Sequence, residues 1–295
     1  MKISDVQSRV IFGSFSLTRV GVKDIRKPIT IQRPNKRMVF MPTINVYVDL
    51  PANQKGVHMS RNMEIINEVV DESSRAPAKG LENLCVEICK RLLQRHRYAT
   101  CSECSMETPY FLEKNSFDKK SLEEYKLTAK AIAKKGKKLQ MRRWIGVEVT
   151  GMTVCPCCME GTKSILISKN PRIRQQIRKM PAITHNQRNI STVFMEIPEN
   201  RDVDADDLIT MVENSLSTPT YGILKRKEEA KVVYEAHKKP RFVEDVVREI
   251  LEKIIAKYND FPDSATITVH SESEESIHKH NAFAERATTF GELRK

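Results

Sequence analysis

The sequence predicts an α+β protein in which an antiparallel sheet carries two helices on one face. Strand-like and helix-like segments follow one another in the same order in both halves of the 295-residue chain. Neither half contains the glycine-rich loop of a Rossmann or P-loop nucleotide site. Hairpins that flank a pair of helices place both helices on one side of an antiparallel sheet. We place the boundary near Thr153, so the predicted modules cover residues 1–153 and 154–295.

The first half has two segments of helical periodicity between strand-like segments. Apolar residues recur every three or four positions in the helical segments and dominate the strands. Ser60 stands where the N-cap of the first helix is expected. The predicted elements are a possible strand within 14–32, a strand over 38–50, helices over 61–70 and 81–93, and strands over 97–112 and 142–153.

The second half repeats this order. Asp204 stands at the expected N-cap of its first helix, and Asp206 and Asp207 suit the first turn, where the helix dipole favours negative charge. The predicted elements are a strand over 190–197, helices over 205–216 and 243–258, and a strand over 265–270.

Positive charge is concentrated in one part of the chain. There are 50 Lys+Arg and 38 Asp+Glu, a net charge of +12, but residues 114–143 alone hold 11 basic and 3 acidic residues, a net of +8. Leu122, Tyr125, Ala129 and Ile132 have helical spacing, which predicts a surface helix and a flexible basic turn within a solvated insertion over 114–140. Such a charge is compatible with nucleic acid, a membrane surface or a small polyanion such as a nucleotide.

The overall composition predicts a folded cytoplasmic protein. Hydrophobic residues make up 40% of the chain and charged residues 30%, and the first residues lack the apolar core of a signal peptide. No apolar stretch approaches the roughly 18 residues that cross a bilayer. The seven cysteines are an odd number, which favours thiols or metal ligands over a disulfide framework.

Three clusters of Cys, His and Glu, at 151–161, 182–189 and 271–284, could carry chemistry. Thiolate, imidazole and carboxylate together are the ligands of a catalytic transition-metal ion. Glu275 and His278 would project from one side if their stretch begins a helix. His185, just ahead of a strand, could shuttle a proton. His280 and Glu272 are further candidate ligands.

A zinc-stabilised nucleic-acid-binding protein is the alternative interpretation. Cys101-x-x-Cys104 and Cys155-x-x-Cys158 could form two zinc knuckles, with the basic segment as an arm. The 50 residues between the two pairs exceed the roughly 15–20 expected of a zinc ribbon.

Six motifs occur in the order seen in type IB GTP cyclohydrolases, which the sequence resembles over about residues 38–284. The long segment between the Cys and His motifs most resembles the archaeal MptA-type branch of that family. The motifs are GVHMSR at 56–61, CPC at 155–157, HNQR at 185–188, LKR followed by two Glu at 224–229, PRFVED at 240–245 and ESIH at 275–278.

The resemblance implies a tunnelling fold (T-fold), present twice per subunit and assembled into barrels by oligomerisation. A homo-oligomer, either a dimer or a tetramer, would have its active sites between subunits. The implied reaction opens the imidazole ring of GTP, releases C8 as formate and forms a 7,8-dihydroneopterin phosphate, with the 2′,3′-cyclic phosphate of methanopterin biosynthesis favoured. Neither a nucleic-acid nor a membrane partner is expected. A pterin or deazapurine enzyme with the same guanine anchor is a third possibility.

The resemblance also implies roles for individual residues. Cys155 would act at the reaction centre as a metal ligand, and Fe(II) is favoured over Mn(II) or Zn(II) as the metal. Glu229 is a further implied ligand, with its neighbour Glu228 as the alternative. His185 would be the catalytic acid and base, and Glu244 the guanine anchor. The complete ligand set is Cys155, Glu229, Glu275 and His278, and the candidate triphosphate contacts are His58, Arg61, Arg188, Lys225 and Arg226.

Overall fold

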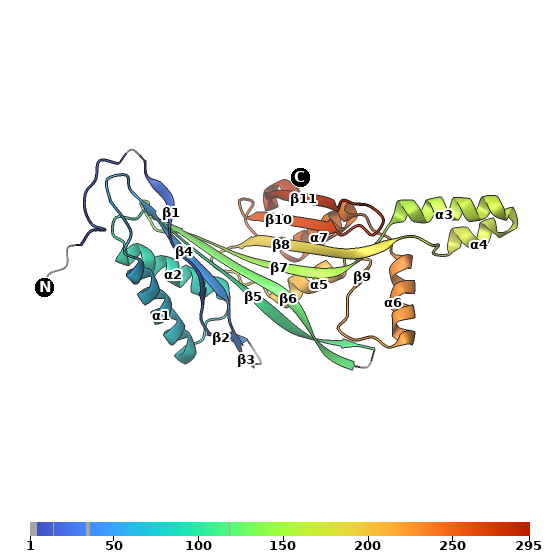
Figure 1. Cartoon of the computed structure of the whole chain (residues 1–295), viewed down its shortest axis with the longest axis horizontal. Coiled ribbons are helices and arrows are strands. Elements are labelled where there is room, and N and C mark those ends of the chain that lie inside the picture. Colours follow the sequence, from blue (N-terminus) through green and yellow to red (C-terminus); the bar gives the residue numbers. More distant parts are fainter. Residues whose placement is uncertain (1–4, 14, 34–35, 118) are drawn as a thin grey trace. The chain divides into compact units, whose positions relative to one another are not determined.

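The computed structural model describes residues 5–13, 15–33, 36–117 and 119–295. Ser14, at the start of one predicted strand, and Asp118, within the predicted insertion, lie outside these residues. Figure 1 labels the elements, which are β1 (Leu17–Arg26), β2 (Ile29–Arg33), β3 (Lys36–Phe40), β4 (Thr43–Leu50), α1 (Met59–Arg75), α2 (Leu81–Arg95), β5 (Cys101–Ser116), β6 (Lys119–Lys134), β7 (Gln140–Val154), α3 (Pro156–Lys169), the 3-10 helix η1 (Pro171–Ile173), α4 (Arg174–Lys179), β8 (Asn186–Ile197), α5 (Ala205–Glu213), β9 (Thr218–Pro219), α6 (Arg226–Lys238), α7 (Val243–Lys257), β10 (Thr266–Ser273), β11 (Ala282–Thr289) and α8 (Phe290–Leu293).

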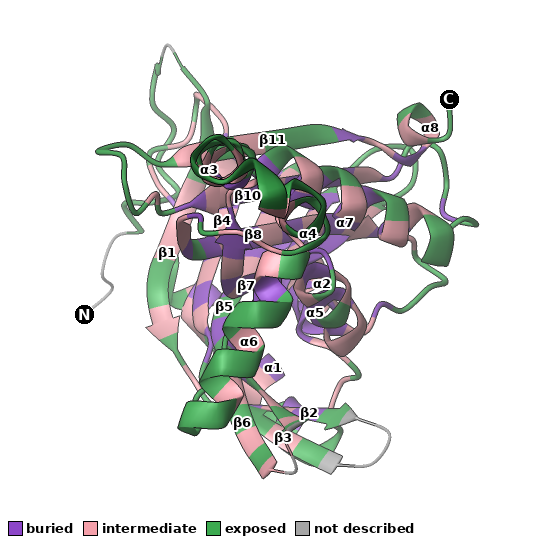
Figure 2. Cartoon of the chain, turned by 90° about the vertical axis from the view of Figure 1, so that its right-hand side faces the viewer, coloured by how far each residue is buried: buried purple, intermediate pink, exposed green. Residues whose placement is uncertain are grey.

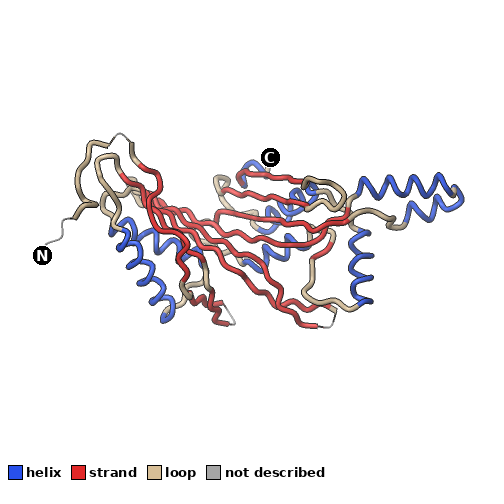
Figure 3. Tube along the Cα trace, viewed as in Figure 1, coloured by secondary structure: helices blue, strands red, loops and turns tan. Residues whose placement is uncertain are grey.

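The fold is mixed α/β with a large antiparallel sheet, as predicted. Its strands follow the order β1-β4-β5-β6-β7-β8-β10-β11, and the short β9 pairs with β7. Antiparallel register places Val48 opposite Ser102 between β4 and β5, and Val269 opposite Val193 between β10 and β8. The strands β2 and β3 form a separate two-stranded sheet (Figure 3).

The chain forms two compact units. Unit 1 comprises residues 1–110, 126–145 and 196–202, and unit 2 comprises 111–125, 146–195 and 203–295. These units are not two contiguous halves, because β5, β6 and β7 each contribute one part of their length to each unit. The predicted division into modules at residue 153 stays a prediction.

In unit 1, the helices α1 and α2 bury their apolar faces and pack on each other. Ile65 and Ile66 of α1 and Ile88 and Leu92 of α2 are fully buried, as is Val46 of β4. Residues of β4 alternate between partly and fully buried positions, because successive side chains of a strand point to opposite faces. Both predicted helices are confirmed.

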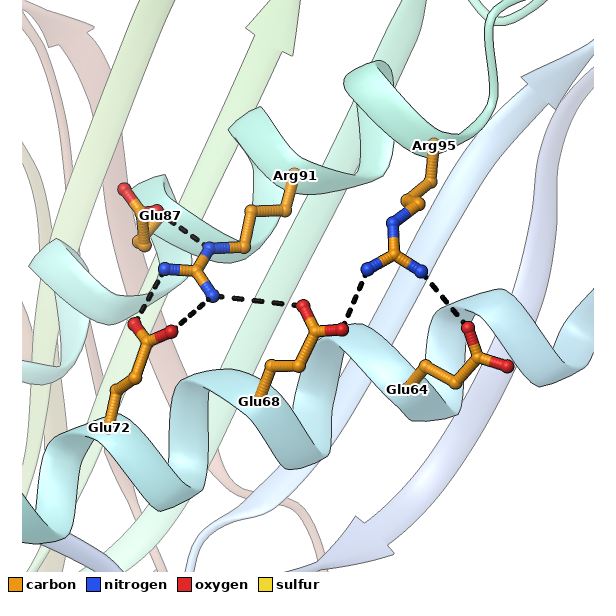
Figure 4. A network of polar contacts seen from close by, with 6 residues as sticks. All are labelled: Glu64, Glu68, Glu72, Glu87, Arg91 and Arg95. Carbon is orange, nitrogen blue, oxygen red and sulfur yellow. Dashed lines mark hydrogen bonds and ion pairs between the residues drawn. The ribbon is translucent and has the colours of Figure 1, made fainter.

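The exposed sides of α1 and α2 are joined by ion pairs, which Figure 4 shows. Arg91 binds Glu72 at 2.6 Å and Glu87 at 2.8 Å, and Arg95 binds Glu68 at 2.7 Å. Exposed pairs are each worth at most about 1 kcal/mol, so the buried apolar contacts are what hold these helices together.

In unit 2, α7 packs on β10 and β11, and α5 packs on α7. Val246 and Ile250 of α7, Leu208 of α5 and Val269 of β10 are fully buried. Asp204 caps α5 as predicted, since its side chain accepts a hydrogen bond from the Asp206 amide at 3.0 Å. Figure 2 shows buried positions on inner strands such as β7 and β8, whereas α3, α4 and α6 are largely exposed.

The helix predicted from the apolar spacing of residues 121–132 is wrong, because this segment is the strand β6. Tyr125, Leu127, Ala129, Ala131 and Ala133 are all buried and alternate with more exposed residues. A period of two places all five on one face of a strand, whereas a helix would scatter them around its axis. The basic segment is therefore part of the sheet, and its lysines occupy the more exposed positions.

Other predicted boundaries also shift. The strand predicted over 38–50 is two strands, β3 and β4, with Pro42 between them. The N-cap of α1 is His58 rather than Ser60, which lies inside the helix. The helices α3, α4 and α6 were not predicted; their faces are only weakly buried, so they lack the apolar stripe that identifies a core helix. Among the described residues, no helix has the length and apolarity needed to cross a membrane.

Candidate active site

A cavity of ≈ 390 Å³ in unit 2 brings together the three predicted Cys, His and Glu clusters. Cys155, His185, Glu275 and His278 line it, and so does Glu244. These five residues come from segments separated by up to 123 positions in the sequence, and the sheet of unit 2 gathers them.

Cys155 reaches the cavity from the end of β7. It is the N-cap of α3, and its Sγ atom accepts a hydrogen bond from the Cys158 amide at 3.4 Å, while Pro156 occupies the first position of the helix. The Cys155 amide donates to the carbonyl oxygen of His185 at 3.1 Å, and the Thr184 hydroxyl donates to the Cys155 carbonyl at 2.8 Å. These bonds bring the end of β7 beside the start of β8.

His185 and Glu275 are joined through Gln187. His185 Nδ1 is 2.9 Å from Gln187 Oε1, and Gln187 Nε2 donates to Glu275 Oε1 at 3.1 Å. Glu275 Oε2 is 3.5 Å from His185 Nδ1 and is buried without a hydrogen-bond partner among the described residues. The side chains of His185 and Glu275 are 10% and 9% exposed, so both are held away from bulk water.

His278 lies in the connection between β10 and β11. No helix forms there, so the helical arrangement under which Glu275 and His278 would project from one side is not present. The amide of Glu274 donates to the carbonyl of Arg188 at 2.9 Å and fixes the start of the connection. The His278 ring lies edge-on to His185, with centroids 6.3 Å apart, and stacks on His280 at 5.1 Å.

Glu244 stands in the first turn of α7, at the exposed rim of the cavity. The Arg241 amide donates to the Val154 carbonyl at 2.9 Å, which fixes the entry to α7 beside the end of β7. Phe242 and Phe283 also line the cavity and are 44% and 57% exposed. A carboxylate and two accessible aromatic rings therefore border the same space.

The predicted fourth ligand, Glu229, does not line this cavity. It lies exposed on α6 and has no side-chain hydrogen bond or ion pair with the described residues. Its neighbour Glu228 caps the same helix through the Lys225 amide, at 2.6 Å, and binds Lys119 at 2.8 Å. Glu228 is thus engaged in structure, so of the two carboxylates Glu229 is the available one, and its role as a ligand stays a prediction.

None of the predicted triphosphate contacts is among the residues that line the cavity. Lys225 and Arg226 are exposed at the start of α6, and Arg188 is an exposed residue of β8 on the opposite face from Gln187. His58 and Arg61 belong to unit 1, where His58 Nε2 is 2.9 Å from Asp5 Oδ1. Their binding roles stay predictions.

The residue types at the cavity suit a divalent transition metal. A thiol, a carboxylate and imidazoles border one space, and Glu275 Oε2 is a buried oxygen that lacks a hydrogen-bond partner among the described residues. Within the described parts of the chain, no three His, Cys, Asp or Glu side chains are arranged as a ready metal site. Cys155, Glu275 and His278 border one cavity and suit the predicted ion in the type of their donor atoms, and their role as ligands stays a prediction.

The alternative zinc knuckle at Cys101 and Cys104 does not fit the structure. Both residues lie on β5, where side chains three positions apart point to opposite faces. Cys104 is fully buried, and burial raises its pKa well above the ordinary value, which keeps the thiol protonated. This pair therefore cannot bind one ion together.

Comparison with known proteins identifies the family. The sequence model of the type I GTP cyclohydrolase folE2 family matches residues 3–284. The chain belongs to the type I GTP cyclohydrolase family. It is 44% identical over 289 residues to the GTP cyclohydrolase MptA of Methanobrevibacter smithii, covering 95% of this chain and 93% of that protein. It is 40% identical over 300 residues to the GTP cyclohydrolase MptA of Methanothermobacter thermautotrophicus, covering 98% of this chain and 94% of that protein.

Solved structures share the fold of this cyclohydrolase chain. A hyper-thermostable AgUricase mutant has a TM-score of 0.54 and 11% identity, covering 96% of this chain and 94% of its own. Uricase from Arthrobacter globiformis has a TM-score of 0.50 and 10% identity, with 96% of each chain covered. At such low identity the likeness concerns the fold alone, and it is consistent with the predicted T-fold.

Sequence reasoning missed several residues of the cyclohydrolase cavity. Gln187 follows His185 by two positions at the start of a strand, a spacing that places both on one face and could have indicated it. Arg241 and Phe242 lie within a recognised motif but were given no role. Phe283 lies on β11, within the 271–284 cluster, and was given no role.

Proposed function

We propose that this chain is a metal-dependent GTP cyclohydrolase. It opens the imidazole ring of GTP, releases C8 as formate and forms 7,8-dihydroneopterin 2′,3′-cyclic phosphate for methanopterin biosynthesis. The observation that carries the proposal is the shared cavity of Cys155, His185, Glu275, His278 and Glu244 in a chain of the GTP cyclohydrolase family. We further propose that the enzyme acts in the cytoplasm, the compartment that supplies GTP.

The proposed metal ligands are Cys155, Glu275 and His278, with Glu229 as the fourth. One thiolate and two carboxylates would more than neutralise a divalent ion, and the mixed S, O and N donors suit Fe(II), with Mn(II) or Zn(II) as alternatives. A divalent ion held there would lower the pKa of water from 15.7 towards about 7 and so supply the nucleophile for C8. The buried free oxygen of Glu275 supports this assignment.

His185 is the proposed general acid and base. It lies beside Glu275 in the cavity and is only 10% exposed, so it is positioned to act on a group bound in that cavity. As the bonds from C8 to the ring nitrogens break, those nitrogens need protons, and an imidazole can deliver them near neutral pH.

Glu244 is the proposed guanine anchor. A carboxylate can accept hydrogen bonds from N1–H and the exocyclic amino group of guanine together, a pair of donors that adenine lacks. Its position at the cavity rim, in the first turn of α7, supports this role. The same position also favours a carboxylate through the helix dipole alone, and the activity of Glu244→Gln with GTP distinguishes the two explanations.

The triphosphate contacts are proposed to be His58, Arg61, Arg188, Lys225 and Arg226. Since none of them lines the cavity of the single chain, we propose that active sites form between subunits of a homo-oligomer, a dimer or a tetramer of tandem T-fold modules. The likeness to uricase structures supports the fold part of this proposal.

The test is anaerobic incubation of the metal-free protein with GTP, with and without Fe(II), Mn(II) or Zn(II). Release of formate and a product that becomes a fluorescent pterin on oxidation is expected, and the mass of the product distinguishes the cyclic phosphate from the triphosphate. Unchanged GTP under every metal condition would overturn the proposal. Conversion of another pterin or deazapurine substrate instead would favour a different enzyme of the same fold.

A further inference from the structure

Gln187 is hydrogen-bonded to two residues of the cavity, His185 and Glu275, which have different roles in the proposed function. It is 7% exposed and lies on β8, two positions after His185 and on the buried side of the strand. Its side-chain oxygen is 2.9 Å from His185 Nδ1 and its nitrogen is 3.1 Å from Glu275 Oε1. No other described side chain is bonded to both of them.

The orientation of the Gln187 amide follows from its partners. The Gln187 amide nitrogen donates to Glu275 Oε1, so the amide oxygen points the other way. The amide oxygen then faces His185, and because it is only an acceptor, His185 Nδ1 must be the donor. Glu275 Oε2 lies 3.5 Å from the same nitrogen but forms no hydrogen bond with it, so Gln187 is the hydrogen-bond partner of Nδ1.

We propose that Gln187 is a positioning residue that keeps the proton of neutral His185 on Nδ1 and leaves Nε2 as the nitrogen that exchanges protons with the substrate. The inference rests on the proposed function for the role of His185, but not for the tautomer itself. When Nε2 takes up a proton, Nδ1 still donates to Gln187, so the ring keeps its orientation through the proton transfer.

The bond from Gln187 to Glu275 has a second effect. The Gln187 amide donates to Oε1 of Glu275 and so orients the carboxylate. The other oxygen, Oε2, is left without a hydrogen-bond partner among the described residues. Partners that orient ligand side chains in this way typically change metal affinity or activity by about 10- to 100-fold when they are removed. A Lys or Arg in place of Gln187 would supply no acceptor to His185, which explains why an amide suits this position.

The test uses Gln187→Met, which keeps the length of the side chain and removes both hydrogen bonds, and Ser191→Ala as the matched control. Ser191 is a fully buried polar residue of the same strand whose hydroxyl bonds to Asn189 and Ser271, outside the cavity. Loss of a buried hydrogen bond should lower stability in both variants. Only Gln187→Met should lower kcat for formate release, by about 10- to 100-fold, with KM for GTP nearly unchanged.

The second readout needs neither metal nor activity. Nitrogen-15 NMR of histidine-labelled, metal-free protein at pH 8, assigned by comparison with His185→Asn, should show His185 with its proton on Nδ1, and a mixture of tautomers in Gln187→Met. A proton on Nε2 in the unmodified protein, or an equal loss of kcat in both variants, would overturn the inference. If the unmodified protein releases no formate from GTP, the proposed function fails while the NMR result still decides the role of Gln187.

Discussion

The buried histidine His96 makes the stability of unit 1 depend on pH. It is 0% exposed, and its Nε2 is 2.7 Å from Asn62 Oδ1 while its Nδ1 is 3.0 Å from the Tyr98 hydroxyl. The pKa of His96 is lowered from 6.5 to about 4, first by burial and then by the nearby charges of Arg61 and His58. The folded protein therefore keeps this ring neutral under conditions in which the unfolded chain protonates it.

The sign and the size of the effect follow from proton binding. Between pH 6.5 and 4 the unfolded state binds more protons at His96 than the folded state does, so the free energy of unfolding falls as the pH falls. The contribution is fully present above pH 6.5. At pH 5, which is 1.5 units below the ordinary pKa of histidine, the free energy of unfolding is lower by about 2 kcal/mol, because each pH unit contributes about 1.36 kcal/mol.

The substitution His96→Gln should remove this pH dependence. Glutamine supplies one donor and one acceptor, so it can retain both hydrogen bonds without titrating. Trp144, the one tryptophan of the sequence, lies in unit 1, so its fluorescence follows the unfolding of this unit in urea. Between pH 7.5 and 5 the free energy of unfolding of the original protein should fall by about 2 kcal/mol more than that of the variant. Equal losses in both proteins would refute the assignment of the effect to His96.

Three further predictions concern the site and unit 2. Glu244→Gln should lower kcat/KM for GTP by about 10- to 100-fold, the loss expected when a hydrogen bond to a charged group is removed, while an unchanged kcat/KM would leave Glu244 with only its helix-dipole role. Cys155→Ala should abolish metal retention measured by elemental analysis and Cys101→Ala should not, whereas loss of the metal in Cys101→Ala would favour the zinc alternative. Glu213→Gln weakens the hydrogen bonds that Glu213 accepts from the Tyr125 hydroxyl at 2.5 Å and from Lys114 at 2.6 Å. It should lower the free energy of unfolding by about 2 kcal/mol, measured by urea denaturation followed by circular dichroism. The control Glu235→Gln, in an exposed ion pair, should lower it by at most about 0.5 kcal/mol. Similar losses in these last two variants would contradict the structural role of Glu213.

The basic segment shows where sequence patterns were ambiguous. Leu122, Tyr125, Ala129 and Ile132 have helical spacing, yet the same stretch also alternates with a period of two, and the structure is the strand β6. Local spacing could not decide between the two, because the choice depends on whether neighbouring strands are present to complete the hydrogen bonds. Contacts made far along the chain, such as Lys114 with Glu213 and Lys119 with Glu228, hold the first part of this segment in unit 2, whereas residues 126–143 belong to unit 1.

The candidate site was predictable in its residue types but not in its geometry. Cys155, His185, Glu275 and His278 stood out because thiol, imidazole and carboxylate groups cluster in short motifs, and the cavity contains all four. The spacing of Glu275 and His278 would place them on one side of a helix, but both residues lie outside any helix, after the end of β10. The link through Gln187 depends on the pairing of β8 with β10, which no local pattern encodes.

The sequence by itself determined the α+β class, the helices α1, α2, α5 and α7, and the family, because apolar periodicity and ordered motifs are properties of the chain alone. Only the tertiary structure decided that the basic segment is a strand, that Cys101 and Cys104 face opposite sides of β5, and that Gln187 lies between His185 and Glu275. Each of these depends on which strands pair and in which register, and a shift of one residue would turn every side chain to the other face.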